Sequence, residues 1–109
     1  MRYTLKRNGD FRRLYKRGKV CATRSVVVYV TRPRYVVSHY GITVTKSIGN
    51  AVKRNRAKRV IRAAFRELRP YLNKEYDFVF VARNFTTECK SNVVLKDMRY
   101  AMRKLELLK

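Results

Sequence analysis

Basic side chains recur every three or four residues in the middle of this chain. At about 100° per residue, one side of a helix would carry Asn55, Arg59, Arg62 and Arg66. Lys58 and Arg69 flank this stripe on one shoulder, and Arg56 flanks it on the other. A guanidinium group can bind two phosphate oxygens at once, so the stripe predicts a surface that binds phosphate.

The alternative is an ordinary solvated helix face, which usually mixes charges of both signs. Between Lys46 and Arg66 there is no acidic residue. The helix therefore lacks the Glu–Lys pairs that would each stabilise it by about 0.2 to 0.5 kcal/mol. Because like charges one turn apart repel, a bound anion would relieve the repulsion, and we favour phosphate binding.

Cleavage chemistry by the protein itself would need clustered acids, or a histidine beside a nucleophile. The acids are instead scattered along the chain: Asp10, Glu67, Glu75, Asp77, Glu88, Asp97 and Glu106. Cys21, Cys89 and His39 cannot supply the closely spaced ligand pairs of a structural zinc site. We expect the two cysteines to be buried thiols, and we predict no catalytic residue and no metal held by protein side chains alone.

The composition narrows the partner to a polyanion. With 28 Lys plus Arg against 7 Asp plus Glu, the formal net charge is +21, and nucleic acid, an anionic membrane or an acidic protein would relieve the self-repulsion. No apolar run approaches the roughly 18 residues of a membrane span, and no signal segment follows the first residue. The chain also has no Trp. We therefore expect a cytoplasmic protein with no membrane partner.

Hydrophobic residues make up 46% of the 109 residues, enough for one domain with its own core over residues 1–109. Asn8 is a favourable helix N-cap and Gly18 a favourable end, which predicts a short first helix. The apolar residues at helical spacing between them are Phe11, Leu14 and Tyr15.

Two β-branched segments, residues 21–31 and 37–45, predict strands that pair as an antiparallel hairpin. Residues 77–82 are almost uniformly apolar, which predicts a strand at the centre of the sheet.

A long helix is predicted from the cap Asn50 to Leu68. The side of this helix that should pack on the sheet carries Val52, Ala57, Val60, Ile61, Ala64, Phe65 and Leu68. A last helix should begin near Ser91 or Asn92, with an apolar stripe of Val94, Met98, Ala101, Met102, Leu105 and Leu108. The order of elements predicts an α+β or α/β sandwich with helices packed against a sheet.

Residues 41–62, GITVTKSIGNAVKRNRAKRVIR, closely resemble the signature of the bacterial ribonuclease P protein subunit, whose centre is the motif Arg54-Asn55-Arg56. Residues 76–83 resemble a later strand of that family. Further positions fall where the family keeps similar residues: Asn8, Asp10, Phe11, Tyr15, Gly18 and Arg24. Ser47 stands where many members carry a second lysine, which removes one possible phosphate contact.

The resemblance implies a single-domain α/β sandwich, with a mixed sheet of about four strands and a left-handed βαβ crossover around the long helix. It also implies the non-catalytic protein subunit of an endoribonuclease whose RNA subunit removes the 5′ leader of precursor tRNA. Mg²⁺ is expected through that RNA. The implied partners are ribonuclease P RNA and the leader, with no obligate protein partner.

Two groups of site residues follow from the resemblance. The residues implied to bind the catalytic RNA are Lys53, Arg54, Asn55, Arg56, Lys58, Arg59 and Arg62. The residues implied to bind the leader are Phe11, Tyr15, Val28, Thr43, Thr45 and Lys46. Aromatic faces suit an unpaired strand because every base can stack on them, although Phe11 and Tyr15 could instead be core residues.

A ribosomal protein, or another protein that binds structured RNA, would have the same size and charge. Only the long motif argues against this alternative function. The distinguishing experiment is reconstitution with a ribonuclease P RNA and a precursor that carries a leader.

Overall fold

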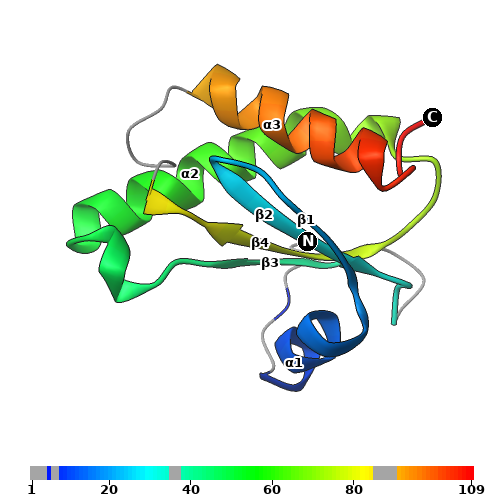
Figure 1. The fold of residues 1–109 in the computed structure, drawn as a ribbon, viewed down its shortest axis with the longest axis horizontal. Helices are drawn as coiled ribbons and strands as arrows, with labels where there is room; N and C mark the ends of the chain where they lie inside the picture. The colour runs from blue at the N-terminus through cyan, green and yellow to red at the C-terminus, as the bar shows by residue number, and fades with distance from the viewer. Residues whose placement is uncertain (1–4, 6–7, 35–37, 85–90) are drawn as a thin grey trace.

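The computed structural model describes residues 5, 8–34, 38–84 and 91–109, and Figure 1 shows the arrangement of its helices and strands. In chain order these elements are α1 (Asn8–Arg17), β1 (Lys19–Ala22), β2 (Val26–Thr31), β3 (Tyr40–Thr43), the 3₁₀ turn η1 (Lys46–Ile48), α2 (Ala51–Leu68), the 3₁₀ turn η2 (Arg69–Tyr71), β4 (Asp77–Ala82) and α3 (Ser91–Lys104). The predicted α+β class and its three helices are confirmed.

The four strands form one mixed sheet in the order β1-β2-β4-β3. β1 pairs antiparallel with β2, β2 pairs antiparallel with β4, and β3 pairs parallel with β4. The predicted position of residues 77–82 at the centre of the sheet is therefore confirmed. The β3–α2–β4 connection is a crossover between parallel strands, and its left-handed sense stays a prediction.

The predicted hairpin between residues 21–31 and 37–45 is wrong. Residues 21–31 are not one strand, because a turn at Thr23 separates β1 from β2. The Thr23 backbone N–H and side-chain hydroxyl both donate to the carbonyl of Val26, at 2.9 and 2.6 Å. This turn makes β1 the hairpin partner of β2, and the apolar β4 takes the other edge of β2.

One face of the sheet packs against α2 and α3 and forms the main core. The rings of Phe65, Phe78 and Phe80 lie in contact there, with centroids 5.0 to 5.4 Å apart. The predicted apolar side of α2 is buried at Ala57, Ile61, Ala64, Phe65 and Leu68, and Val60 is half-buried. Val52 is the exception to the prediction: it is 74% exposed, in the first turn of α2, which projects beyond the strands in Figure 1.

The last helix also follows its predicted pattern. Val94, Met98, Ala101 and Met102 are fully buried. Leu105 and Leu108 pack against the same core from beyond the end of the helix at Lys104. No helix among the described residues is long and apolar enough to span a membrane.

The helix α1 lies on the opposite face of the sheet from α2 and α3 (Figure 1). A smaller apolar cluster of Leu5, Leu14 and Val79 is buried beneath it. Cys21 has a free thiol and is half-buried at the edge of the main core, whereas Cys89 lies outside the described residues.

A buried serine ties the starts of β3 and β4 together. The backbone N–H and the hydroxyl of Ser38 both donate to the carboxylate of Glu75, and the N–H of Tyr76 donates to the same hydroxyl at 2.8 Å. The hydrogen bond from the Ser38 side chain is the main reason that the pKa of Glu75 is held below its usual range.

A carboxylate with a lowered folded-state pKa adds stability above its unfolded pKa, about 4.3 for glutamate, and this stability is lost as the pH falls through the folded-state pKa. We expect Glu75→Gln to lower the free energy of unfolding at pH 7 by less than about 1 kcal/mol, because water screens this exposed group. The difference should vanish in acid. Denaturant unfolding of both proteins across this range measures it, and a difference independent of pH would contradict the prediction.

Candidate RNA interface

The outer side of α2 presents an unbroken set of basic groups. The predicted stripe of Asn55, Arg59, Arg62 and Arg66 is exposed along its whole length. Of the other residues expected to bind the catalytic RNA, Lys53, Arg56 and Lys58 are exposed and Arg54 is half-buried. Among the described residues, the ion pairs within 4.0 Å involve only Arg13 and Arg34, so these cations face solvent without an acidic partner.

Arg69, the predicted flank of the stripe, has a different environment. Its guanidinium lies 5.7 Å from the centroid of the Phe65 ring and donates to the carbonyl of Ser38 at 3.0 Å. The side chain therefore fastens the end of α2 to the segment before β3. Its charge lies closer to the protein core than those of the exposed stripe.

A short connection fixes where α2 begins relative to the sheet. The predicted cap is confirmed, since the side-chain oxygen of Asn50 accepts from the backbone N–H of Lys53 at 3.0 Å. Gly49 has φ +138°, a backbone conformation that residues with a side chain rarely adopt. The hydroxyls of Thr45 and Ser47 lie 2.6 Å apart in the turn before it. This connection leaves Thr45 and Lys46 exposed between the end of β3 and the start of the basic helix.

A second candidate surface lies on the sheet face that α1 only partly covers. Tyr15 is 41% exposed, and its hydroxyl lies 3.0 Å from the hydroxyl of Thr43. The ring of Tyr29 meets the ring of Tyr15 edge to face, with centroids 4.9 Å apart. Val27 and Val81 are paired on neighbouring strands of this same face and are half-buried. Tyr15 is therefore an exposed aromatic platform, held in place by Thr43 and Tyr29.

Phe11 has a more structural role than Tyr15. It is half-buried and packs against the cluster of Leu5, Leu14 and Val79. A Cβ at Gly41 would lie 2.6 Å from the Phe11 ring, so the ring fits only because Gly41 has no side chain. Phe11 is therefore in large part a core residue, which is the alternative considered from the sequence.

The assignment of Val28 to the leader surface is wrong. Val28 is fully buried in the main core, on the face covered by α2 and α3. Side chains alternate along a strand, so its neighbour Tyr29 lies on the open face instead. Sequence reasoning missed Tyr29 because the run of valines around it does not reveal which face is buried.

Residues able to bind a metal do not gather in the part of the chain that the structure describes. No group of three His, Cys, Asp or Glu side chains lies close enough there to hold an ion. The acidic side chains that are buried make internal contacts instead. Asp77 accepts from Arg13, Arg34 and His39, and Asp10 accepts from Arg34.

Comparison with known proteins gives one consistent family. Residues 1–106 match the family model described as Ribonuclease P. The ribonuclease P protein component of Listeria innocua is 38% identical over 110 residues, which cover 99% of this chain and 92% of that protein. The same component of Clostridium beijerinckii is 44% identical over 91 residues, which cover 77% of this chain and 73% of that protein.

Two solved structures extend the similarity to the fold. The RNase P protein of Staphylococcus aureus matches with a TM-score of 0.87 at 29% identity, covering 100% of both chains. The RNase P protein of Thermotoga maritima matches with a TM-score of 0.78 at 27% identity, covering 91% of this chain and 94% of that one. The similarity therefore includes all the elements that carry the two candidate surfaces.

The position of α1, and with it Tyr15, depends on the buried carboxylate of Asp77. Arg13 donates to it at 2.7 Å, and the backbone N–H groups of Arg34 and His39 donate at 3.1 and 3.0 Å. We expect Asp77→Ala to lower the free energy of unfolding by about 3 to 5 kcal/mol, because it removes a buried acceptor of three hydrogen bonds and leaves Arg13 only its longer ion pair with Asp10, at 3.8 Å. Denaturant unfolding measures the loss.

Asp97→Ala is the matched control for Asp77→Ala, since half-buried Asp97 accepts a hydrogen bond from the Ser25 hydroxyl at 2.7 Å. Its expected cost is about 1 to 2 kcal/mol. Equal losses in the two variants would show that Asp77 is an ordinary hydrogen-bond acceptor and does not anchor α1.

Proposed function

This chain belongs to the ribonuclease P protein family, and we propose that it binds the catalytic RNA and the 5′ leader of precursor tRNA as the non-catalytic protein subunit of that ribonucleoprotein. The observation that carries this proposal is the acid-free, exposed basic side of α2 in a chain that matches the family over residues 1–106. The match to this family supports it over the alternative of a ribosomal protein.

The basic helix is the proposed docking surface for the catalytic RNA. The residues proposed to contact it are Lys53, Arg54, Asn55, Arg56, Lys58, Arg59 and Arg62. Each phosphate that these cations neutralise releases counterions, so the affinity should fall steeply as salt rises. Arg66 continues the same exposed stripe toward the end of α2 and belongs to this proposed surface.

The open sheet face beside α1 is the proposed leader site. Tyr15 offers a ring on which an unpaired base can stack, a contact worth about 1 to 3 kcal/mol. Tyr29 and Thr43 hold that ring in place, and Thr45 and Lys46 extend the surface toward α2. Phe11 contributes the edge of the site through its packing over Gly41.

In this proposal the RNA subunit performs the cleavage, and Mg²⁺ acts through that RNA. The protein's part is to bind, to orient the leader and to place cations among phosphates that repel one another. Protein and magnesium should therefore substitute for each other in part, and the protein should lower the magnesium concentration that cleavage needs. A role in the processing of bacterial precursor tRNA would place the chain in the cytoplasm.

Neutralising Arg56, Arg59 and Arg62 together with glutamine tests the docking surface. We expect weaker binding to ribonuclease P RNA and a slope of log affinity against log salt that is smaller by roughly 2 to 3, from about 0.7 to 0.9 per phosphate contact. The measurement is a titration of the RNA at several salt concentrations, followed by cleavage of a precursor in the reconstituted enzyme. Unchanged affinity and slope in a folded variant would remove this side of α2 from the interface.

Tyr15→Ala tests the leader site. The variant should reduce the preference for precursor over mature tRNA by about 5- to 150-fold, because it removes a stacking contact of about 1 to 3 kcal/mol. Tyr15→Phe is the control, since it keeps the ring and removes only the hydroxyl that lies beside Thr43. Equal losses of affinity for precursor and mature tRNA would place Tyr15 outside the leader site.

A further inference from the structure

A cationic hollow, separate from both proposed surfaces, lies at the end of the sheet where β4 begins, away from the start of α2. Its volume is about 560 Å³. Four basic residues from four different segments line it: Arg17 at the end of α1, Lys19 in β1, Arg32 after β2, and Lys74 before β4. Neither the proposed docking surface nor the proposed leader site uses any of these residues.

These four cations face one acid. Among the described residues that line the hollow, Glu106 is the only acid. None of the four lies within 4.0 Å of an acidic group in the described part of the chain, where all such pairs belong to Arg13 and Arg34. Val30 and Tyr76 also line the hollow, and the Lys74 ammonium lies 5.7 Å from the centroid of the Tyr76 ring. The hollow is therefore concave, with an excess of positive charge.

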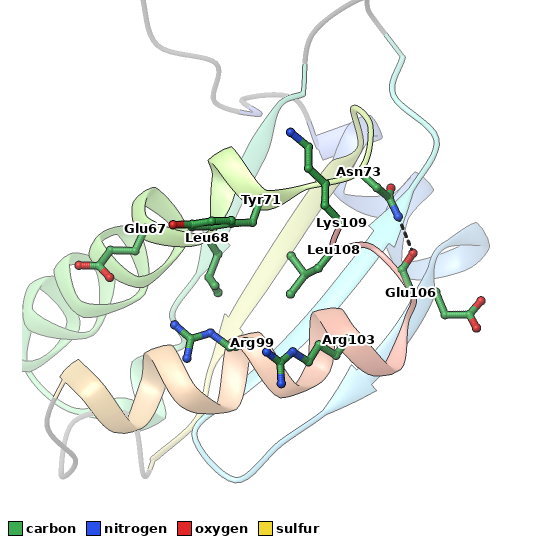
Figure 2. A pocket seen from close by; sticks show the side chains of 9 residues that line it. All are labelled: Glu67, Leu68, Tyr71, Asn73, Arg99, Arg103, Glu106, Leu108 and Lys109. Carbon is green, nitrogen blue, oxygen red and sulfur yellow. Dashed lines mark hydrogen bonds between the residues drawn. The ribbon is translucent and has the colours of Figure 1, made fainter.

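A larger pocket nearby, of about 770 Å³, is less suited to an anion (Figure 2). Arg99, Arg103 and Lys109 line it together with two acids, Glu67 and Glu106, so its charges almost balance. It also lies where α2 and α3 both end, and the free carbonyls of helix C-termini carry partial negative charge. Arg103 lies in the last turn of α3, where a cation stabilises the helix itself.

The exposed side of α1 connects the cationic hollow to the proposed leader site. A depression of about 490 Å³ lies on this helix, and both Tyr15 and Arg17 line it. Arg12 and Lys16 also line it and are exposed, and its described lining residues include no acid. Arg17 also lines the cationic hollow, so the basic surface is continuous from Tyr15 to Lys74.

We propose that the hollow formed by Arg17, Lys19, Arg32 and Lys74 binds the phosphodiester backbone of the more distant, 5′ part of the leader, after the strand has passed Tyr15 and crossed α1. This inference rests on the proposed function and extends it. The continuity with Tyr15 makes the leader, not the catalytic RNA, the occupant. Binding through phosphates gives affinity that depends on leader length and salt, without a preference for sequence.

The test uses the reconstituted enzyme and two precursors that differ only in leader length. Unpaired leaders of about 4 and about 12 nucleotides both fall within the roughly 4 to 16 nucleotides that a single-strand-binding fold covers, the first at its lower end. We expect the long leader to bind about tenfold more tightly at low ionic strength, with a salt slope larger by about 2 from three further phosphate contacts. The variant Lys19→Gln, Arg32→Gln, Lys74→Gln should lose this gain and bind the short leader normally.

A variant with the same loss of charge elsewhere is the control. Lys96, Arg99 and Lys104 are exposed on α3 and outside the hollow, so their replacement by glutamine should preserve the gain from the long leader. If both variants lost the tighter binding of the long leader to the same extent, the effect would depend only on net charge. That result would overturn the proposal.

Other outcomes separate this proposal from the proposed function. A wild-type enzyme that binds both precursors equally would overturn the proposed hollow site alone. Weaker binding of the hollow variant to the catalytic RNA without a precursor would assign the hollow to that RNA and overturn the leader assignment. Failure of the wild-type protein to bind the catalytic RNA, or to favour the short precursor over mature tRNA, would instead contradict the proposed function.

Discussion

The buried carboxylate of Asp77 is the interaction on which the rest of the structure depends. It lies at the start of the central strand and accepts from the Arg13 side chain and from two backbone N–H groups that precede β3. Arg13 belongs to α1, so one fully buried side chain fixes both the helix and the segment that enters β3. Tyr15 lies two residues further along the same helix, so these contacts also help to fix the position of its exposed ring.

The few acids of this chain explain why so many of its cations are free. Asp10 and Asp77 pair with arginines, Glu75 accepts from Ser38, and Asp97 accepts from Ser25. Acidic residues thus hold the fold together from within, and α2 has none before Glu67. Much of the excess in the net charge of +21 therefore lies on the outer sides of the three helices. RNA can offset this repulsion without displacing any internal ion pair.

The sequence predicted the elements whose pattern has only one interpretation. The apolar side of α2, the Asn50 cap and the buried β4 follow from periodicity and cap chemistry. Strand pairing was not predictable, because the turn at Thr23 has neither glycine nor proline and β2 matches either partner in composition. Val28 was assigned to the wrong face and Tyr29 was missed for a related reason, since a continuous run of valines hides the alternation. Val52 was misplaced because periodicity gives a direction around a helix but not where the sheet ends.

The actual strand pairing matters for function in a way that the predicted hairpin would not. Because β3 pairs with β4 and not with β2, the chain leaves β3 at the edge of the sheet and enters α2 within a few residues. That connection is fixed by the positive φ of Gly49 and the Asn50 cap. Thr43, beside Tyr15, is therefore joined to the basic start of α2 by a connection that has hydrogen bonds of its own. A leader bound beside Thr43 would lie at a defined distance from a catalytic RNA bound at the start of α2. Binding itself would therefore position the substrate.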